Sequence, residues 1–286
     1  MASPALVKPV VVVETPSLRI TEAFGRVATQ DAACSLAFGV VTQKSEARFQ
    51  SPLFEEYIFC MEGAMDLIFG AKDAEQTLRV TPGQGVFLPM GLRVKWTWPE
   101  GGAKYTALCL PAFSPELTRT EEDGASPPAD LDESLQPQLF TPVNVVDAPT
   151  ITITERFGHV ASKQGACSLA TAVVRTAAEE AYQAPGFDEF VMCTAGSIQF
   201  VHAEETCAIS AGEAIFLPKH LRVKWIWPEA AQYTVVCLPA FNPEISGREP
   251  EESATVAKDS ASMQRLKELH EGAGSVAMAE EPVRGA

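Results

Sequence analysis

A glutamine, a glutamate, a cysteine and two tryptophans recur in the same order in two parts of this chain, and these residue types can support chemistry. A glutamate whose pKa is raised by burial can act as a general acid or base. An indole face attracts an organic cation, and a nearby carboxylate supplies the counter-charge. The first set is Gln50, Glu56, Cys60, Trp96 and Trp98, and the second set is Gln183, Glu189, Cys193, Trp225 and Trp227.

The two sets match because the chain contains an internal duplication. Residues Lys8–Glu116 recur, with changes, as Thr141–Glu244. The clearest stretch is RVKWTWPE at Arg93–Glu100, which returns as RVKWIWPE at Arg222–Glu229. A repeat of this length is typical of a duplicated domain, since solenoid units are much shorter. Each functional hypothesis therefore applies to both copies.

The composition excludes several classes of partner. The formal net charge is −15, which disfavours binding to nucleic acid or to an anionic membrane surface. No apolar run reaches the ~18 residues of a membrane-spanning helix, and the start of the chain lacks the apolar core of a secretory signal. The sequence therefore predicts a cytoplasmic protein with no nucleic-acid or membrane partner.

The cysteine pattern favours buried, reduced thiols. The chain has seven cysteines and no CxxC motif, so a zinc ribbon or a thioredoxin-like motif is absent from it. Six of them form equivalent pairs in the two copies, and a buried thiol behaves as a small apolar group. The pairs are Cys34/Cys167, Cys60/Cys193 and Cys109/Cys237, while Cys207 stands alone.

Short apolar segments separated by glycine and proline fill both copies and predict an all-β fold. The RVKWTWP segment alternates strictly, and GQGVFLP reads as a short buried strand closed by proline. Many short strands at close spacing are typical of a sandwich or barrel. We expect domains over residues 1–117 and 140–246, an acidic Pro-rich linker over 118–139, and a mobile tail over 247–286 with a short helix near Met263–Glu271.

The order of turns and strands resembles the cupin superfamily. The spacing E-x6-G at residues 56–63 and 189–196 matches the end of the first cupin motif. The spacing G-x5-P-x-G at residues 83–91 matches the start of the second, and residues 212–220 match it with His220 in place of the last glycine. The resemblance implies a bicupin, with two tandem double-stranded β-helix (jelly-roll) barrels. Its LPAFSP-like ending is most similar to the ethanolamine-utilisation Q-type cupins.

The chain departs from the cupin pattern at the metal ligands. The resemblance implies a metal held by His, His, Glu and His inside the barrel. Imidazole suits transition metals, whereas glutamine is a poor ligand and proline and valine are none. We therefore expect no metal and no cofactor in either copy. The four slots hold Gln50, Pro52, Glu56 and Val94 in the first copy, and Gln183, Pro185, Glu189 and Val223 in the second.

Two interpretations of the barrel interior stay open. Alternation places Trp96 and Trp98 inside with Val94, and Glu56 and Cys60 inside on a facing strand. The tryptophans either fill the space that metal and ligands would occupy, or they line a pocket for a small organic ligand, a cation included. The first copy is the expected binder, because the second has the bulkier His220 near the barrel mouth.

The resulting hypothesis is a metal-free bicupin that acts as a small-ligand-binding protein or as a structural or assembly protein. One alternative is a cupin-type isomerase or lyase, with Glu56 or Glu189 as general acid or base. The thiols are weaker candidates, since neither has an evident base to form a thiolate. Another alternative is a metal-dependent cupin with an unusual ligand set. A monomer, a dimer and a component of a larger assembly are all compatible with the sequence.

Overall fold

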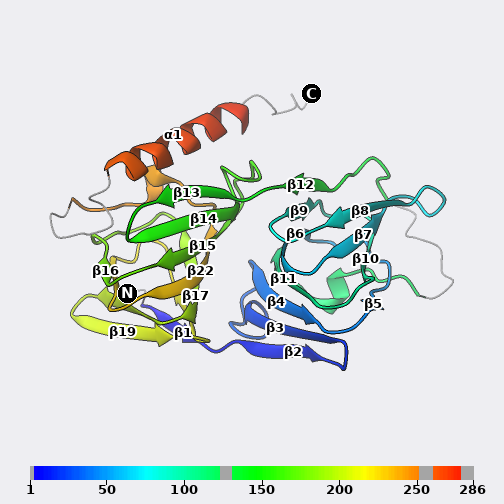
Figure 1. The fold of residues 1–286 in the computed structure, drawn as a ribbon, viewed down its shortest axis with the longest axis horizontal. Coiled ribbons are helices and arrows are strands. Elements are labelled where there is room, and N and C mark those ends of the chain that lie inside the picture. Colours follow the sequence, from blue (N-terminus) through cyan, green and yellow to red (C-terminus); the bar gives the residue numbers. More distant parts are fainter. Residues whose placement is uncertain (1–2, 123–130, 251–259, 278–286) are drawn as a thin grey trace. The chain divides into compact units, whose positions relative to one another are not determined.

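The computed structural model describes residues 3–122, 131–250 and 260–277, and its chain divides into two compact units (Figure 1). One unit is Lys8–Thr141, here called the first barrel. The other comprises Met1–Val7 and Pro142–Ala286, here called the second barrel. Both units consist almost entirely of strands, so the predicted all-β class is confirmed.

The first barrel contains a seven-stranded and a four-stranded antiparallel sheet. Their strand orders are β12-β9-β6-β11-β4-β3-β2 and β5-β10-β7-β8. Side chains from both sheets form one apolar core, in which Leu67 and Trp96 of the small sheet join Ile58 and Val86 of the large one. The strands are β2 (Val10–Glu14), β3 (Leu18–Phe24), β4 (Ser35–Val41), β5 (Ser45–Glu46), β6 (Glu55–Glu62), β7 (Met65–Phe69), β8 (Gln76–Val80), β9 (Gly85–Leu88), β10 (Val94–Trp98), β11 (Ala103–Leu110) and β12 (Gln138–Phe140).

The second barrel repeats this plan. Its sheets have the orders β1-β20-β17-β22-β15-β14-β13 and β16-β21-β18-β19, and they also enclose a single core. The strands are β1 (Ala5–Val7), β13 (Val143–Asp147), β14 (Ile151–Phe157), β15 (Ser168–Val174), β16 (Ala178–Glu179), β17 (Asp188–Ala195), β18 (Ser197–His202), β19 (Glu205–Ser210), β20 (Ala214–Leu217), β21 (Val223–Trp227) and β22 (Ala231–Leu238).

The period-two pattern of the tryptophan strands is realised in both barrels. In β10, Val94, Trp96 and Trp98 are buried, while the residues between them are partly exposed. β21 has the same alternation. The strand therefore points both indoles into the barrel, as its sequence predicts.

A glycine is required at the matching hairpin of each barrel. Gly63 and Gly196 have φ of 70° and 71°, a region that residues with a Cβ rarely adopt. A Cβ would also lie 2.4 Å from the Gly102 carbonyl oxygen in one case and 2.2 Å from that of Ala230 in the other. Steric demand thus explains the glycine that ends the E-x6-G spacing.

The first strand of each copy pairs within the other barrel. β1 lies antiparallel to β20, with Ala5 opposite Phe216, and β12 lies antiparallel to β9, with Gln138 opposite Phe87 (Figure 1). Each added strand covers an otherwise open sheet edge. The division into compact units at residues 7/8 and 141/142 follows these edge strands, whose three residues carry too little pattern to reveal their partner.

The tail contains a helix that packs on the second barrel. α1 (Ser260–Ala277) is longer than the helix expected around Met263–Glu271, and it contacts β13. Met263, Leu266 and Leu269 join the core of the second barrel. Ser262 donates to the Asp147 carbonyl at 3.3 Å. The described part of the tail is thus held to the barrel, whereas residues 251–259 and 278–286 lie outside the described part. Short 3₁₀ helices occur at Pro115–Leu117 and Pro243–Ile245.

No helix among the described residues is both long enough and apolar enough to cross a membrane.

Candidate functional site

The predicted site residues lie inside the barrels. Both glutamates, both cysteines and all four tryptophans are buried, as is Gln183, whereas Gln50 is half-buried. Gln50 pairs with Val94 through the backbone, and Gln183 pairs with Val223 in the same way. Two of the positions that correspond to cupin ligand slots are therefore adjacent in each barrel.

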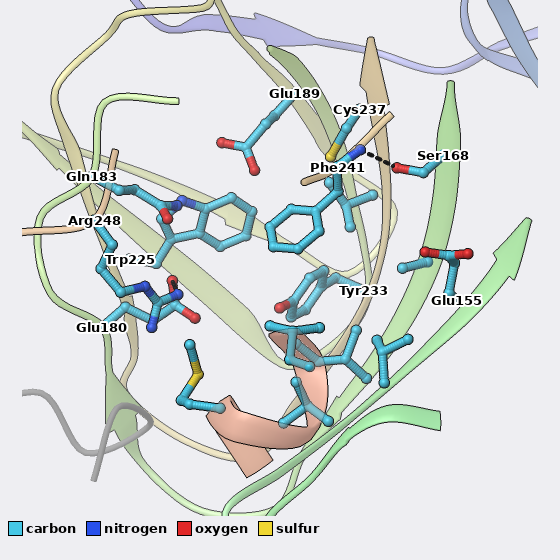
Figure 2. A pocket seen from close by; sticks show the side chains of 17 residues that line it. Glu155, Ser168, Glu180, Gln183, Glu189, Trp225, Tyr233, Cys237, Phe241 and Arg248 are labelled. Atoms are coloured by element: carbon cyan, nitrogen blue, oxygen red, sulfur yellow. Dashed lines mark hydrogen bonds and ion pairs between the residues drawn. The ribbon is translucent and has the colours of Figure 1, made fainter. Parts of the chain in front are cut away.

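A cavity of about 100 Å³ lies in the second barrel (Figure 2). Of the predicted residues, Gln183, Glu189 and Trp225 line it. Trp227 is fully buried in the core instead, stacked on Tyr233 with ring centroids 5.9 Å apart. The cavity thus favours the second copy as the binder, contrary to the expectation drawn from His220.

Glu189 faces this cavity without a partner. Its residue is 7 % exposed, and within the described part of the chain its carboxyl group has no hydrogen bond and no ion pair. Burial raises its pKa to about 8; the nearby Glu180 carboxylate adds to the rise and the Arg248 guanidinium opposes it. A buried charge is costly unless it is paired, so Glu189 holds a proton at neutral pH.

An ion pair forms another wall of the cavity. Arg248 Nη2 donates to Glu180 Oε2 at 3.1 Å, while Arg248 Nη1 is buried and has no acceptor among the described residues. The backbone sets both residues in place, because the Glu180 N–H donates to the Trp225 carbonyl at 2.9 Å and Arg248 pairs with Gln183. One guanidinium nitrogen is therefore left free to meet a ligand.

Sequence reasoning missed Glu180 and Arg248, although a signal was present. The equivalent residues of the first barrel are Ala47, whose N–H donates to the Trp96 carbonyl, and Thr120, which pairs with Gln50. A comparison of the two copies for positions where only one has a charge would have found the pair.

The rest of the cavity wall is apolar. β13 contributes Val145 and Val146, and α1 contributes Met263 and Leu266. The rings of Trp225, Tyr233 and Phe241 complete the lining, and Figure 2 shows them between Glu189 and the α1 side of the cavity. A mostly apolar cavity with a few convergent polar groups is typical of a small-molecule site.

Two other polar side chains at the cavity have structural partners. Glu155 Oε1 accepts hydrogen bonds from the N–H groups of Val160 and Ala161, each at 2.7 Å. Ser168 Oγ accepts from the Phe241 N–H at 2.9 Å. The first barrel repeats both arrangements with Glu22 and with Ser35. They stabilise the fold and leave Glu189 as the unpaired acid.

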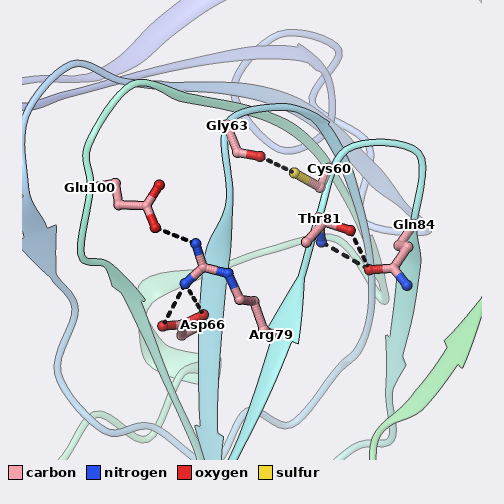
Figure 3. A network of polar contacts seen from close by, with 7 residues as sticks. All are labelled: Cys60, Gly63, Asp66, Arg79, Thr81, Gln84 and Glu100. Carbon is pink, nitrogen blue, oxygen red and sulfur yellow. Dashed lines mark hydrogen bonds and ion pairs between the residues drawn. The ribbon is translucent and has the colours of Figure 1, made fainter.

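The cysteines of the predicted sets support hairpins. Cys60 Sγ lies 3.6 Å from the Glu62 carbonyl and 3.9 Å from that of Gly63 (Figure 3). Cys193 Sγ lies 3.3 Å from the Ala195 carbonyl. Burial raises the pKa of Cys60 to about 11 and raises that of Cys193. Both thiols therefore stay protonated near neutral pH and are poor nucleophiles.

The outer surface of the first barrel carries an ordinary ion-pair network. Arg79 on β8 pairs with Asp66 at 3.2 Å and also with Glu100 (Figure 3). Thr81 donates to the Gln84 side chain at 2.8 Å. These groups are largely exposed and tie neighbouring strands together, so they are no candidates for a ligand site.

Glu56 occupies the corresponding place in the first barrel. It is buried, and its Oε2 atom has no hydrogen-bond partner within residues 3–122, 131–250 and 260–277. Burial raises its pKa to about 7; the nearby Trp96 indole N–H, which forms no hydrogen bond of normal geometry with it, offsets part of the rise. Trp98 stacks on Tyr105 with centroids 6.0 Å apart. The surrounding set lacks the ion pair of the second barrel.

The residues in the cupin ligand slots do not fit a metal ion. Val94 and Val223 offer no donor atom, and each barrel retains one carboxylate and one amide there. Among the described residues, no three or more His, Cys, Asp or Glu side chains are grouped so that they could hold a metal. The donor set therefore disagrees with the metal centre that the cupin resemblance implies.

Comparisons with known proteins identify the fold. No family model and no curated protein matches the chain. Solved structures of oxalate decarboxylase do match. The Bacillus subtilis enzyme, for which Mn(II) centres are described, has a TM-score of 0.61 at 11% identity over 82% of this chain and 76% of its own.

Two further structures agree with this result. The B. subtilis enzyme at pH 4.6 has a TM-score of 0.61 at 11% identity over 82% of this chain and 75% of its own. Another oxalate decarboxylase structure has a TM-score of 0.64 at 10% identity over 85% and 79%. The chain thus has the fold of two tandem cupin barrels. The similarity to ethanolamine-utilisation Q-type cupins stays a prediction.

Proposed function

We propose that this bicupin is a metal-independent protein that binds a small organic molecule in its second barrel. The observation that supports this most directly is Glu189, which is buried beside a cavity and has no partner among the described residues. A buried carboxyl group is costly unless it is hydrogen-bonded or paired. A ligand in the cavity supplies that missing partner.

The size of the cavity limits the ligand. Its volume is about 100 Å³, whereas an engineered apolar cavity of roughly 150 Å³ holds one benzene molecule. The ligand, or the part of it that enters the barrel, therefore has about five non-hydrogen atoms. The polar groups around the cavity indicate a molecule with at least one hydrogen-bonding group.

The helix α1 gives the site a closed wall. Met263 and Leu266 line the cavity, and the helix is tied to β13 through Ser262 and through Arg265, which donates to the Asn144 carbonyl at 3.3 Å. Excluding water from this side strengthens polar contacts inside the barrel. Ligand exchange then requires movement of α1 or passage through another side of the barrel.

A cavity-filling variant tests the proposal without removing any polar group. Ala170 lines the cavity, and Ala37 is its counterpart in the first barrel. We expect a thermal-shift screen of small amines, acids, alcohols and sugars to yield a ligand that stabilises the wild type. Ala170→Leu should abolish this shift, whereas Ala37→Leu should keep it.

The screen and a metal analysis together decide between this proposal and its alternatives. The purified protein should contain well under one equivalent of Fe, Mn, Ni, Cu or Zn. Near-stoichiometric metal that is lost with Glu189→Ala would support a metal-dependent cupin instead. If no compound stabilises the wild type, the structural or assembly role remains and the binding proposal fails.

A second candidate function is acid–base catalysis by Glu189. The observation that favours it is the pKa of about 8, which suits a general acid or base near neutral pH. An isomerase or lyase of this kind would convert a ligand found in the screen. Product analysis by NMR with wild type and Glu189→Gln tests the idea, and an unchanged ligand would leave binding as the function.

A further inference from the structure

We infer that the second barrel binds a small organic amine, held as its ammonium ion between Glu189 and the faces of Trp225 and Tyr233. The inference rests on the proposed function and assigns the chemical class of its ligand. It follows from the charges, the aromatic rings and the unsatisfied donors at the cavity, taken one after another.

The charges at the cavity leave one acid without a counter-charge. Glu155 is satisfied by two backbone N–H groups, and Glu180 by Arg248. Only Glu189 has no partner among the described residues that line the cavity. A cation would balance the ionised form of this acid, whereas an anion would add to an excess of carboxylates that already includes Glu180.

Aromatic rings surround the place where the cation would lie. The Trp225 and Tyr233 rings have centroids 5.6 Å apart and are inclined at 46°, and both line the cavity with Phe241. Indole and phenol faces attract an ammonium ion, most strongly where water is excluded. The same rings offer an anion no favourable contact.

Two donors at the cavity point to an oxygen atom on the ligand. Arg248 Nη1 and Trp225 Nε1 are buried and have no acceptor in the part of the chain that the structure describes, and both residues line the cavity. A buried hydrogen-bond donor that has no acceptor destabilises the folded protein. A hydroxyl group on the amine would satisfy at least one of these donors while the ammonium group meets Glu189.

Binding of an amine should release a proton from Glu189. The group is protonated near neutral pH because its pKa is about 8, and it must ionise to pair with an ammonium ion. The affinity should therefore rise as the pH approaches 8 and fall at lower pH by about tenfold per unit. An ordinary exposed carboxylate would produce no such dependence in this range.

Four probes of nearly equal size separate the chemical classes. Isobutylamine, isobutanol and isobutyrate share a carbon skeleton but are cationic, neutral and anionic, and 1-amino-2-propanol adds a hydroxyl group to an amine of the same size. At pH 8 we expect isobutylamine to bind about tenfold more tightly than isobutanol or isobutyrate, as measured by calorimetry or ligand-observed NMR. The hydroxylated amine should bind more tightly than isobutylamine.

Variants and buffers identify the group responsible. Glu189→Gln should remove the preference for the amine, and the matched Glu56→Gln change in the first barrel should leave it intact. Calorimetry of the wild type in two buffers of different ionisation enthalpy should reveal release of a proton on binding. This second measurement tests the inference even if Glu189→Gln does not fold.

The outcomes distinguish the ligand class from the site itself. If isobutanol or isobutyrate binds best and Ala170→Leu blocks it, the amine inference is wrong but the binding site stands. If the amine binds with no proton release and equally well to Glu189→Gln, the role of Glu189 is wrong. If no probe and no compound of the wider screen binds, the inference and the proposed function both fail.

Discussion

The two barrels share their strand order and inward tryptophans, but among the described residues only the second contains a charged pair beside its glutamate. Glu180 and Arg248 stand where the first barrel has Ala47 and Thr120. The second barrel is also closed by α1, which contacts β13, while in the first barrel Val10, Val11 and Val12 of β2 are exposed. Duplication has thus preserved the core that both copies need, and the differences lie around the cavity.

A second contrast runs in the opposite direction. In the first barrel, Arg93 is 4 % exposed and pairs with Glu121 at 2.6 Å and Glu75 at 2.9 Å. Its counterpart Arg222 is 52 % exposed and pairs with Glu249. The second copy lacks the longer β7–β8 loop that supplies Glu75. The first barrel is therefore the more tightly braced at this arginine.

The largest expected effect tests whether Trp98 and Trp227, the second tryptophan of each pair, mainly fill the cores of their barrels. Trp227→Ala and Trp98→Ala should each lower the free energy of unfolding by about 3–5 kcal/mol, because each removes a large buried aromatic side chain. Denaturant unfolding measures the loss. A much smaller loss for Trp98→Ala alone would indicate that the first barrel holds its tryptophan less firmly, as a ligand pocket would.

The next prediction concerns a variant that breaks the ion pair between Arg248 and Glu180 in the second barrel. Arg248→Ala should lower the free energy of unfolding by about 3 kcal/mol, since it leaves the buried Glu180 without a counter-charge. The double variant with Glu180→Ala should recover much of this loss. Thr120→Ala is the matched control and should change stability little, and a double variant as unstable as Arg248→Ala would contradict the argument.

The contrast between Arg93 and Arg222 predicts that loss of the arginine destabilises the first barrel more than the second. Arg93→Ala should cost about 2 kcal/mol, because it removes a buried cation that serves two carboxylates and stacks on Phe49 at 3.6 Å. Arg222→Ala should have little effect, because exposed ion pairs contribute little. Equal losses in denaturant unfolding would show that the extra loop of the first copy does not brace it.

The smallest effect compares the two buried glutamates through pH. Both have raised pKa values in the folded state, so their protonated forms stabilise it; this contribution is complete below about pH 4.5 and is lost as pH rises to about 7 for Glu56 and about 8 for Glu189. Replacement by glutamine should remove each dependence.

The pKa values of Glu189 and Glu56 in the folded state, about 8 and about 7, differ by about one unit. The pH-dependent stability removed by Glu189→Gln should accordingly exceed that removed by Glu56→Gln by roughly 1 kcal/mol. Unfolding measured from pH 4 to 9 on both variants and the wild type checks this. Identical profiles for the two variants would contradict the predicted difference between the two buried glutamates.

Much of the fold could be read from local pattern. The alternation in RVKWTWP predicted that Trp96 and Trp98 point inward, and the glycine spacing predicted the hairpin at Gly63. The exchange of β1 and β12 could not be predicted in this way, because each has only three residues and its partner strand lies far away in sequence. The packing of α1 on the second barrel could not be predicted either, because amphipathic spacing does not indicate which surface a helix covers.

The sequence by itself determined the duplicated all-β fold and the inward side chains of each strand, because a period of two and a repeated order of turns are local properties of the chain. Only the tertiary structure decided that Trp225 lines a cavity while Trp227 fills the core, and that Glu180 meets Arg248 beside Glu189. Cavities and buried ion pairs depend on how side chains from distant segments of the chain pack together, and a local sequence pattern does not contain that information.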